Sequence, residues 1–526
     1  RPCAMDTRPC KWSDVLVWCC SLLLAAGLLL FASKSSPLFP LNDWVDANTL
    51  LTVGKSLMQG QVLYRDVFDH KGPFIYLAYG LGWLLSHQGT TGGFTGVWLL
   101  EVLCFTVFLR CAWHTVAMYG GTAWATLGLP LLAVLVLHSA SFTHGGSAEE
   151  LVLPLMAVSL LGLARVHQQG VLQAGTWRFF LLGGACVGVA FLSKYSWMGF
   201  WLGGAVVVAG LLVQQRAWAR LGAGLCWAAL GVVLVLLPWL LYFGAHGAMH
   251  AFIEAYFSIN LGAYADKEQR TAGVVLANMA TSMRQNPALA ALMLMGVLGL
   301  LWVPGHARGA WQRLVFVLPC AGLLLSVFGG GKAYVYYFFV FSVFAPLGLA
   351  MMGWSLQRRI QLSQRMAWVG ACVLAAMGVV GTALWHPNAA LRQVRAQDMV
   401  QYRFAALVRQ AQDQTVLNYL GLDMGLHTVL GTVPSVRFFV LNNIDHQANP
   451  LLLDTQRRYV RDAVTEFVVV RGLAGMSEAD LAGTGLLARY QRVATQDQVF
   501  ENIPFTYMLF QRKVPSGLSL APTANR

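Results

Sequence analysis

The amino-acid sequence predicts an α-helical polytopic membrane protein with a small C-terminal α/β domain. Of its 526 residues, 57% are hydrophobic and only 11% are charged, and the mean hydropathy is +0.57. A soluble domain carries roughly 25% charged residues, so this composition does not suit a surface in water. Long apolar runs recur as far as Trp385, where the composition changes. These runs predict many membrane crossings.

About eleven runs are long enough to cross, since a transmembrane helix needs about 20 mostly apolar residues. We expect spans at residues 15–33, 94–116, 121–138, 149–165, 178–193, 196–214, 221–243, 288–304, 312–328, 334–354 and 366–385. The first run lacks a convincing cleavage site before the acidic stretch, which favours a retained signal anchor. A further stretch, Pro73–Leu85, is short, and we expect it to lie along the membrane interface.

The positive-inside rule gives the expected orientation. With Pro73–Leu85 at the interface, the arginines between spans gather on one side, which we assign to the cytoplasm: Arg110, Arg165, Arg178, Arg216, Arg220, Arg308, Arg313, Arg358, Arg359 and Arg365. Acids gather on the other side, in long loops at about 34–93 and 244–287. The net charge of +13 therefore indicates membrane topology and not a nucleic-acid partner.

Residues 387–526 are expected to form an extracytoplasmic α/β domain, because an odd number of spans places them outside. Three short stretches, at 415–420, 436–441 and 466–471, are predicted to be strands. Helix-like stretches lie between them, at 423–430 and 455–464. Alternating strands and helices are typical of a small α/β domain. Residues 1–386 are expected to form the membrane domain.

The first outer loop is rich in ionisable side chains close to the membrane. A carboxylate there can accept the proton of an attacking hydroxyl, which is the task of a general base in group transfer. Any single Asp in an exposed loop can equally cap a helix or keep the loop solvated. The candidates in this loop are Asp43, Asp46, Arg65, Asp69, His70 and Lys71.

A second acidic position follows the sequence Thr143-His-Gly-Gly-Ser-Ala148. Glu149 and Glu150 stand there at the entrance to an apolar run, with His144 just before them. Paired carboxylates at a membrane boundary suit a second functional site. The alternative is a helix start at which Ser147 caps and the acids complement the helix dipole.

Three lysines on the expected outer side depart from the positive-inside tendency, which suggests an anionic partner. They are Lys71, Lys194 and Lys332, and each lies at the edge of an apolar stretch. A lipid phosphate at the interface suits an ammonium group, although ordinary snorkelling is an alternative for Lys194 and Lys332. Tyr334 and Tyr337 follow Lys332 and are substrate-binding candidates or part of an aromatic belt.

No metal site is expected. The histidines match no two-histidine signature on one helix face, and the ten cysteines show no CxxC or zinc spacing.

The first outer loop resembles a known family. Asp46, the Gly54 and Gly60 spacing, and residues 64–73 (Tyr-Arg-Asp-Val-Phe-Asp-His-Lys-Gly-Pro) are similar to the bacterial protein-mannosyltransferase-like and aminoarabinose-transferase-like branch of the GT-C glycosyltransferases. The resemblance covers most of the membrane part and adds little about residues 387–526. It implies a GT-C fold, with a catalytic Asp in the first outer loop and a second acid at the next, where Glu149 and Glu150 stand.

The resemblance also implies an inverting glycosyltransferase that takes a sugar from a polyprenyl phosphate. Asp46 would be the base, with Asp43 as the alternative, and Glu149 and Glu150 would complete the catalytic set. Lys71, Arg65, Lys194 and Lys332 would hold the donor phosphate. Asp69, His70, His144, Tyr334 and Tyr337 would contact substrate. The acceptor would be a hydroxyl of a glycan, lipid or protein of the cell envelope, and no cofactor or obligatory metal is implied.

A transporter or lipid-linked sugar flippase is the alternative. It would place ionisable residues and broken helices at mid-membrane. The acids of this chain instead cluster in the expected outer loops, which favours the transferase. The sugar, the acceptor and the polyprenol do not follow from the sequence.

Overall fold

The computed structural model describes residues 11–86, 93–262, 270–302, 309–447 and 449–513. Residues 263–269 of the expected outer loop at 244–287 lie outside the described residues, and with them Tyr264, Asp266, Lys267 and Glu268. Arg308, one of the arginines assigned to the cytoplasm, lies outside them too. The chain divides into two compact units. The helical unit comprises residues 1–42, 71–249 and 268–393, and the C-terminal unit comprises 43–70, 250–267 and 394–526.

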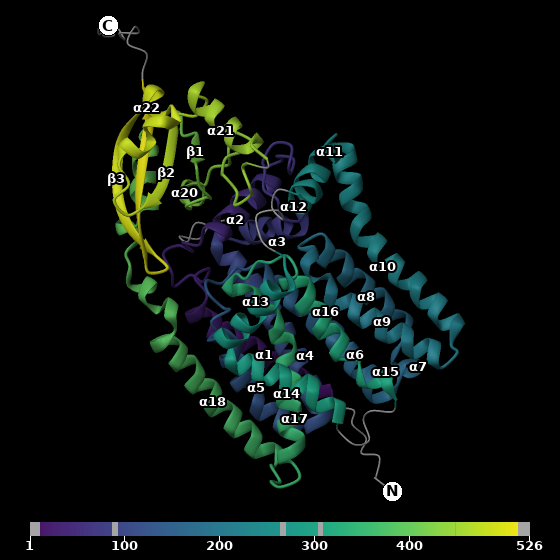
Figure 1. Cartoon of the computed structure of the whole chain (residues 1–526). Helices are drawn as coiled ribbons and strands as arrows, with labels where there is room; N and C mark the ends of the chain where they lie inside the picture. Colours follow the sequence, from purple (N-terminus) through teal and green to yellow (C-terminus); the bar gives the residue numbers. More distant parts are fainter. Residues whose placement is uncertain (1–10, 87–92, 263–269, 303–308, 448, 514–526) are drawn as a thin grey trace, which may run out of the picture. The chain divides into compact units, whose positions relative to one another are not determined.

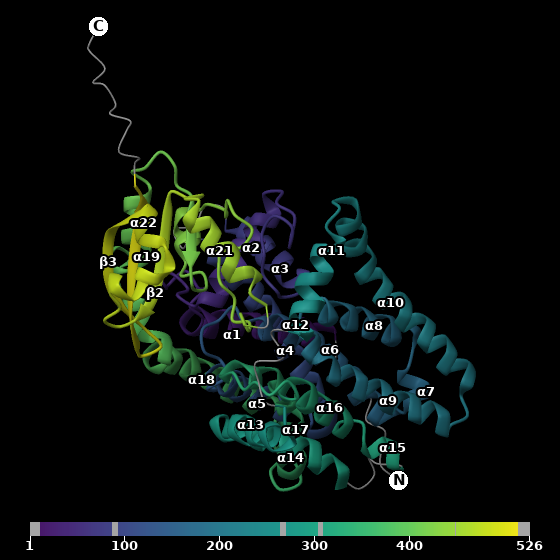
Figure 2. The ribbon, with the colours of Figure 1, turned by 45° about the horizontal axis from the view of Figure 1, so that its top comes forward.

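The helical unit is built almost wholly from apolar helices (Figures 1 and 2). In lipid, every backbone N–H and C=O needs an internal partner, so apolar runs of this length fold as helices. The elements are α1 (Lys11–Ala32), α3 (Pro73–Leu85), α4 (Phe94–Gly120), α5 (Thr122–Leu137), α6 (Ala148–Gln169), α7 (Val171–Ala174), α8 (Trp177–Phe191), η1 (Tyr195–Trp197), α9 (Met198–Gln214), α10 (Trp218–Ala245), α13 (Ala272–Gln285), α14 (Pro287–Trp302), α15 (Ala310–Arg313), α16 (Val317–Phe328), η3 (Val335–Phe344), α17 (Ala345–Leu356), α18 (Gln364–Trp385) and η4 (Pro387–Gln393).

Within the described residues, seven helical segments are long and apolar enough to cross a membrane, so the chain is a multi-pass membrane protein. An eighth crossing is possible if α13 and α14, which meet at a bend of 109°, act as one broken span. The expected spans at 121–138, 178–193 and 312–328 form shorter apolar helices, α5, α8 and α16, and the run at 288–304 forms α14 of the bent pair. The count of eleven stays a prediction. Pro73–Leu85 is the 13-residue helix α3.

Close packing of the helices depends on small residues. α9 and α16 cross at Gly199 and Gly322, where a Cβ on either residue would overlap the backbone of the other. α8 packs along α10, and α18 packs on α5 and α1 (Figures 1 and 2). Only 17% of the apolar stretch of α10 is buried within the protein, and the same holds for α18. Their remaining apolar surface suits contact with lipid chains.

The C-terminal unit combines a four-stranded sheet with short helices. The sheet order is β1-β2-β4-β3, with β1 parallel to β2 and the other pairs antiparallel. The strands are β1 (Val416–Tyr419), β2 (Phe467–Leu473), β3 (Tyr490–Phe500) and β4 (Ile503–Arg512). The helices are α2 (Val45–Met58), α11 (Met249–Phe252), η2 (Ile253–Ser258), α12 (Ile259–Leu261), η5 (Ala396–Asp398), α19 (Val400–Val408), α20 (Leu426–Leu430), α21 (Leu451–Arg461), η6 (Glu478–Thr484) and α22 (Leu486–Arg489).

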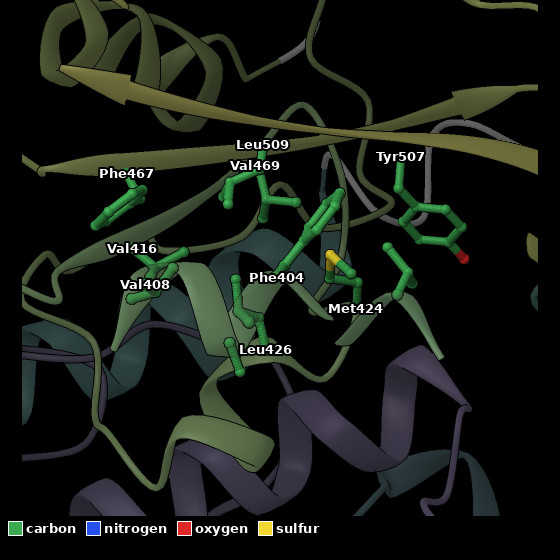
Figure 3. Packing of buried hydrophobic residues seen from close by; sticks show 11 residues of the cluster. Phe404, Val408, Val416, Met424, Leu426, Phe467, Val469, Tyr507 and Leu509 are labelled. Atoms are coloured by element: carbon green, nitrogen blue, oxygen red, sulfur yellow. The ribbon is translucent and has the colours of Figure 1, made fainter. Parts of the chain in front are cut away.

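One buried apolar cluster joins α19 to the sheet (Figure 3). Phe404 and Val408 from one face of α19 pack against Val469 of β2 and Leu509 of β4, each at most 2% exposed. Successive side chains of a strand point to opposite faces of the sheet, so Phe467 and Val469 of β2 lie on the same face. The sequence prediction of an α/β domain in this region is therefore confirmed.

The expected strand at 436–441 is wrong. This segment is irregular, although Phe438, Phe439 and Val440 are all buried. Asn418 N donates to Phe439 O, and Leu441 N donates to Gly421 O, so the segment lies along the end of β1 without forming a ladder. An apolar run indicates that a segment is buried, but it does not determine the backbone conformation of that segment. The β3–β4 hairpin was not predicted.

The first half of the expected outer loop folds as part of the C-terminal unit. Helix α2 is anchored to residues 423–428, because Thr52 Oγ1 donates to Asp423 at 2.7 Å and Lys55 Nζ donates to His427 O at 2.9 Å. Lys55 is only 2% exposed. A buried ammonium of this kind costs free energy unless it is well paired.

We expect Lys55 to make stability depend on pH. Burial lowers the pKa of Lys55 from its ordinary value of 10.5 to about 8, with Asp423 opposing the shift. The folded state therefore disfavours the charged form. The penalty is complete below pH 8 and disappears as the pH rises to 10.5, a gain of about 3 kcal/mol at 1.36 kcal/mol per pKa unit. Lys55→Met removes this gain.

Thermal unfolding of the wild type and Lys55→Met at pH 8 and pH 10 measures the effect. Other groups titrate in both proteins, so the difference between the two proteins isolates Lys55. Parallel pH dependences would contradict the prediction.

Candidate functional site

The residues predicted from sequence fall into two groups, one in each unit. The helical unit contains Lys71, His144, Glu149, Glu150, Lys194, Lys332, Tyr334 and Tyr337. The C-terminal unit contains Asp43, Asp46, Arg65, Asp69 and His70.

Lys194 is the centre of the group in the helical unit. Its Nζ lies 2.8 Å from Glu149 Oε1, and the Glu149 side chain is only 2% exposed. The same Nζ lies 3.8 Å from the ring centroid of Tyr337 and 5.7 Å from that of Tyr336. A cation over aromatic faces is stabilised by the ring quadrupoles. Glu149 takes one of the three N–H bonds, and the others suit an oxyanion.

The tyrosines are presented by an unusual helix. Tyr334 is extended, and the 3₁₀ helix η3 that follows runs for ten residues, longer than such helices usually are. Tyr334, Tyr336 and Tyr337 contact one another, with ring centroids 5.2–5.7 Å apart. Tyr336 contacts Lys194 but was not among the predicted site residues. The structure therefore joins the tyrosine segment to Lys194.

Two of the predicted lysines lie on paired segments of backbone. Gly72 N donates to Ser193 O, and Phe74 N donates to Leu192 O, both at 3.1 Å. These bonds place Lys71 beside the segment that carries Lys194. A Cβ at residue 72 would overlap Leu192 O, so only glycine permits this approach. Lys71 N is itself bonded to Tyr76 OH at 2.9 Å.

Glu150 serves as a helix cap. Ser147 N donates to Glu150 Oε1 at 2.9 Å, and Glu150 N donates to Ser147 Oγ at 3.3 Å, which is a complete capping box at the start of α6. The capping interpretation of this pair is confirmed. Its catalytic role stays a prediction, and of the two acids only Glu149 is shown paired with a lysine.

Residues on or next to several helices contact the turn before α6. His144 O accepts a hydrogen bond from Lys34 N, and Gly146 O accepts one from Tyr79 OH. Glu101 of α4 is 1% exposed and interacts with the Gly146 backbone. Sequence analysis missed Glu101, although a single acid inside an apolar run is the signal that marks it. Lys332 is buried in the turn after α16.

In the C-terminal unit, the two candidate bases differ in exposure. Asp46 stands in the first turn of α2 and is half-buried, whereas Asp43 is 8% exposed. Asp43 lies close enough to Tyr507 of β4 to act electrostatically on its hydroxyl, which helps to raise the pKa of Tyr507 after the larger effect of burial. The surroundings of Asp43 therefore suit an anchoring residue, and Asp46 keeps the access that a base needs.

Asp69 and His70 are held in place by other segments of the C-terminal unit. Asp69 Oδ1 accepts a hydrogen bond from Asn442 Nδ2 at 2.6 Å and lies 3.2 Å from His70 Nδ1. His70 O accepts a bond from Asn260 Nδ2 at 2.6 Å. Asp69 is 1% exposed, and these bonds hold the loop in which it lies. The predicted substrate contacts of Asp69 and His70 stay predictions.

Arg437 connects the same loop to two other segments. It donates to Tyr64 O at 2.8 Å and to Glu254 Oε2 at 3.1 Å. Arg65, by contrast, forms an exposed pair with its neighbour Asp66. The predicted phosphate-binding role of Arg65 stays a prediction. Sequence analysis missed Arg437, which lies in the segment expected to be a strand, and Asn442, which directly follows that segment.

Among the described residues, no group of three or more His, Cys, Asp and Glu side chains could hold a metal ion. The expectation that the chemistry needs no metal stays a prediction.

No protein-family model and no curated protein matches the sequence. Two solved structures are similar over almost the whole chain. ArnT from Cupriavidus metallidurans bound to undecaprenyl phosphate has a TM-score of 0.59 at 12% identity, covering 95% of this chain and 98% of that one. ArnT in the apo state has a TM-score of 0.58 at 13% identity, covering 95% and 97%.

An oligosaccharyltransferase from Archaeoglobus fulgidus reaches a TM-score of 0.45 at 13% identity over 92% of this chain and 73% of that one, which is too distant to inform the fold. The two ArnT structures agree with the arrangement of apolar helices and small C-terminal sheet domain described above. The chain therefore shares the fold of the two ArnT structures.

Proposed function

We propose that this protein is an inverting glycosyltransferase that takes a sugar from a polyprenyl-phosphate donor. The acceptor is a hydroxyl of a cell-envelope glycan, lipid or protein on the outer face of the cytoplasmic membrane. One observation carries the proposal most: Lys194 is fixed by Glu149 and Tyr337, beside the backbone segment of Lys71. Fixed ammonium groups of this kind suit a phosphate at a membrane interface. The shared fold with ArnT bound to undecaprenyl phosphate supports the same donor class.

In the proposed reaction, the acceptor oxygen attacks the anomeric carbon and its proton passes to Asp46. The bond from the anomeric carbon to the phosphate oxygen breaks, and the polyprenyl phosphate leaves with both bonding electrons. Lys194 and Lys71 stabilise the charge that develops on this phosphate. Glu149 holds the Lys194 ammonium in one orientation. A side chain that is already ordered loses less conformational entropy when it binds the phosphate. Attack and departure on opposite faces invert the anomeric configuration.

The experiment that tests the function is product analysis. The purified protein is supplied with a mixture of polyprenyl-phosphate sugars and an envelope extract, and the products are analysed by mass spectrometry. We expect one acceptor to gain the mass of one monosaccharide, together with release of free polyprenyl phosphate. Movement of intact donor across a vesicle membrane without any transfer product would contradict the proposal.

A transporter or flippase is the second candidate, and one observation favours it. The α13–α14 pair is bent by 109°, as expected of a broken span in a transporter. The vesicle assay separates the two functions, because a flippase moves the donor and leaves its sugar–phosphate bond intact.

A further inference from the structure

A second charged cluster lies in the helical unit, formed by α4 together with α1 and α6, each of which packs against α4 (Figure 1). Arg110 of α4 is only 5% exposed. Its Nη2 pairs with Asp14 of α1. Its Nε and Nη1 have no hydrogen-bond partner among the described residues. Buried N–H groups left unpaired cost free energy, so this guanidinium is incompletely satisfied.

The surroundings of Arg110 are positively charged. Arg165 of α6 is near enough to interact with it electrostatically, and His114 Nε2 lies 3.6 Å from the same Asp14 oxygen. Asp14 is thus one carboxylate shared between an arginine and a histidine, with a second arginine beside them. The cluster carries an excess positive charge that an anion would balance.

Aromatic rings frame the cluster. The ring centroids of Trp18 and Trp113 each lie 5.7 Å from the Arg110 guanidinium carbon. Tryptophan is enriched at the level of lipid headgroups, so the cluster has the composition of a membrane interface. A planar guanidinium carries N–H donors on three nitrogens, so it suits phosphate oxygens better than a single point charge does.

We propose that Arg110, Arg165 and His114 form a binding site for the phosphate of an anionic lipid headgroup. The site is distinct from the candidate donor site. Glu149 and Arg165 stand sixteen residues apart on the single helix α6, which is about 24 Å at 1.5 Å per residue. The positive-inside rule assigns the end of α4 that carries Arg110 and the end of α6 that carries Arg165 to the cytoplasmic leaflet. The ligand is therefore a lipid of that leaflet, and its binding does not depend on the transfer reaction.

The test measures lipid binding to the whole protein in neutral detergent. Native mass spectrometry counts retained lipids, and thermal unfolding is followed with phosphatidylglycerol, phosphatidylcholine or inorganic phosphate added. We expect the wild type to retain phosphatidylglycerol and to be stabilised by it, with little response to phosphatidylcholine. Arg110→Gln should weaken binding about tenfold or more, because a charge-assisted hydrogen bond contributes about 1.5–3 kcal/mol.

Three further variants separate a lipid site from a purely structural ion pair. Arg165→Gln changes an exposed residue, so it should fold normally and still weaken binding. Asp14→Asn removes the competing carboxylate and should bind phosphatidylglycerol at least as tightly as the wild type. Arg358→Gln removes an exposed arginine that stacks on Trp354 outside the cluster, and it should bind unchanged.

Equal retention of phosphatidylglycerol by the wild type and Arg165→Gln would overturn the proposal. So would loss of binding in Asp14→Asn, which would mean that the cluster is only an ion pair joining α1 to α4. If inorganic phosphate stabilises the wild type as strongly as phosphatidylglycerol does, the site takes free phosphate and the lipid assignment is wrong.

Discussion

Asp46→Asn is expected to abolish sugar transfer. The amide has nearly the same shape as the carboxylate but cannot accept the acceptor's proton, so the loss should be about 100- to 10,000-fold in kcat. Donor binding and the thermal unfolding midpoint should remain close to those of the wild type, because Asp46 is half-buried in the first turn of α2 and is replaced isosterically. Transfer assays with purified variants, together with binding of the labelled donor, measure both effects.

Asp43→Asn is the matched control for this prediction. Asp43 is more buried than Asp46 and interacts with Tyr507 in the C-terminal unit, so its loss should reduce stability more than the rate constant. If Asp43→Asn abolishes transfer while Asp46→Asn keeps full activity, the base is Asp43. Full activity of both variants would remove general-base catalysis by this loop from the mechanism.

Removal of the Lys194 ammonium is expected to lower both activity and stability. Lys194→Ala leaves the Glu149 carboxylate, 2% exposed, without its 2.8 Å partner. Breaking a buried ion pair from one side costs about 3–5 kcal/mol. Loss of a fixed group that stabilises developing charge should reduce transfer about 100- to 1,000-fold. Unfolding midpoints and transfer rates give the two quantities independently.

The double variant Lys194→Met with Glu149→Gln separates these effects. It removes both charges at once, so most of the lost stability should return, whereas the activity should not. Arg178→Met serves as a surface control, since this exposed arginine stacks on Trp177 at the start of α8, whereas Lys194 follows the other end of that helix. If the double variant recovers transfer as well as stability, Lys194 supports only the fold and the phosphate is held elsewhere.

The helices of the membrane part were predictable because lipid imposes a simple rule. Each of the eleven expected spans forms a helix, and Pro73–Leu85 forms a separate short helix. Helix length was less predictable, since α5, α8 and α16 have only 16, 15 and 12 residues. Apolar runs end where polarity begins, but helices end where turns and neighbouring helices allow. The sequence pattern therefore predicts about eleven crossings, whereas seven helical segments among the described residues have the length of a span.

The candidate site was predicted residue by residue but not contact by contact. A lysine that departs from the positive-inside tendency marked Lys194, yet nothing local identified Glu149, 45 residues earlier, as its partner. Asn442 bonds Asp69 across 373 residues of sequence. A single apolar run could not reveal that the segment at 436–441 braces a loop in place of forming a strand. Pairings of this range arise only when distant segments fold together.

The sequence by itself determined that the chain is a multi-pass helical membrane protein with a C-terminal α/β domain, because hydrophobicity and its period are local properties. It also marked the acids and lysines that depart from those patterns. Only the tertiary structure decided that Glu150 caps α6 while Glu149 binds Lys194, and that α2 belongs to the unit of the C-terminal sheet. The physical reason is that the energy of a buried charge depends on its partner. Packing brings that partner into contact, and spacing along the chain does not reveal it.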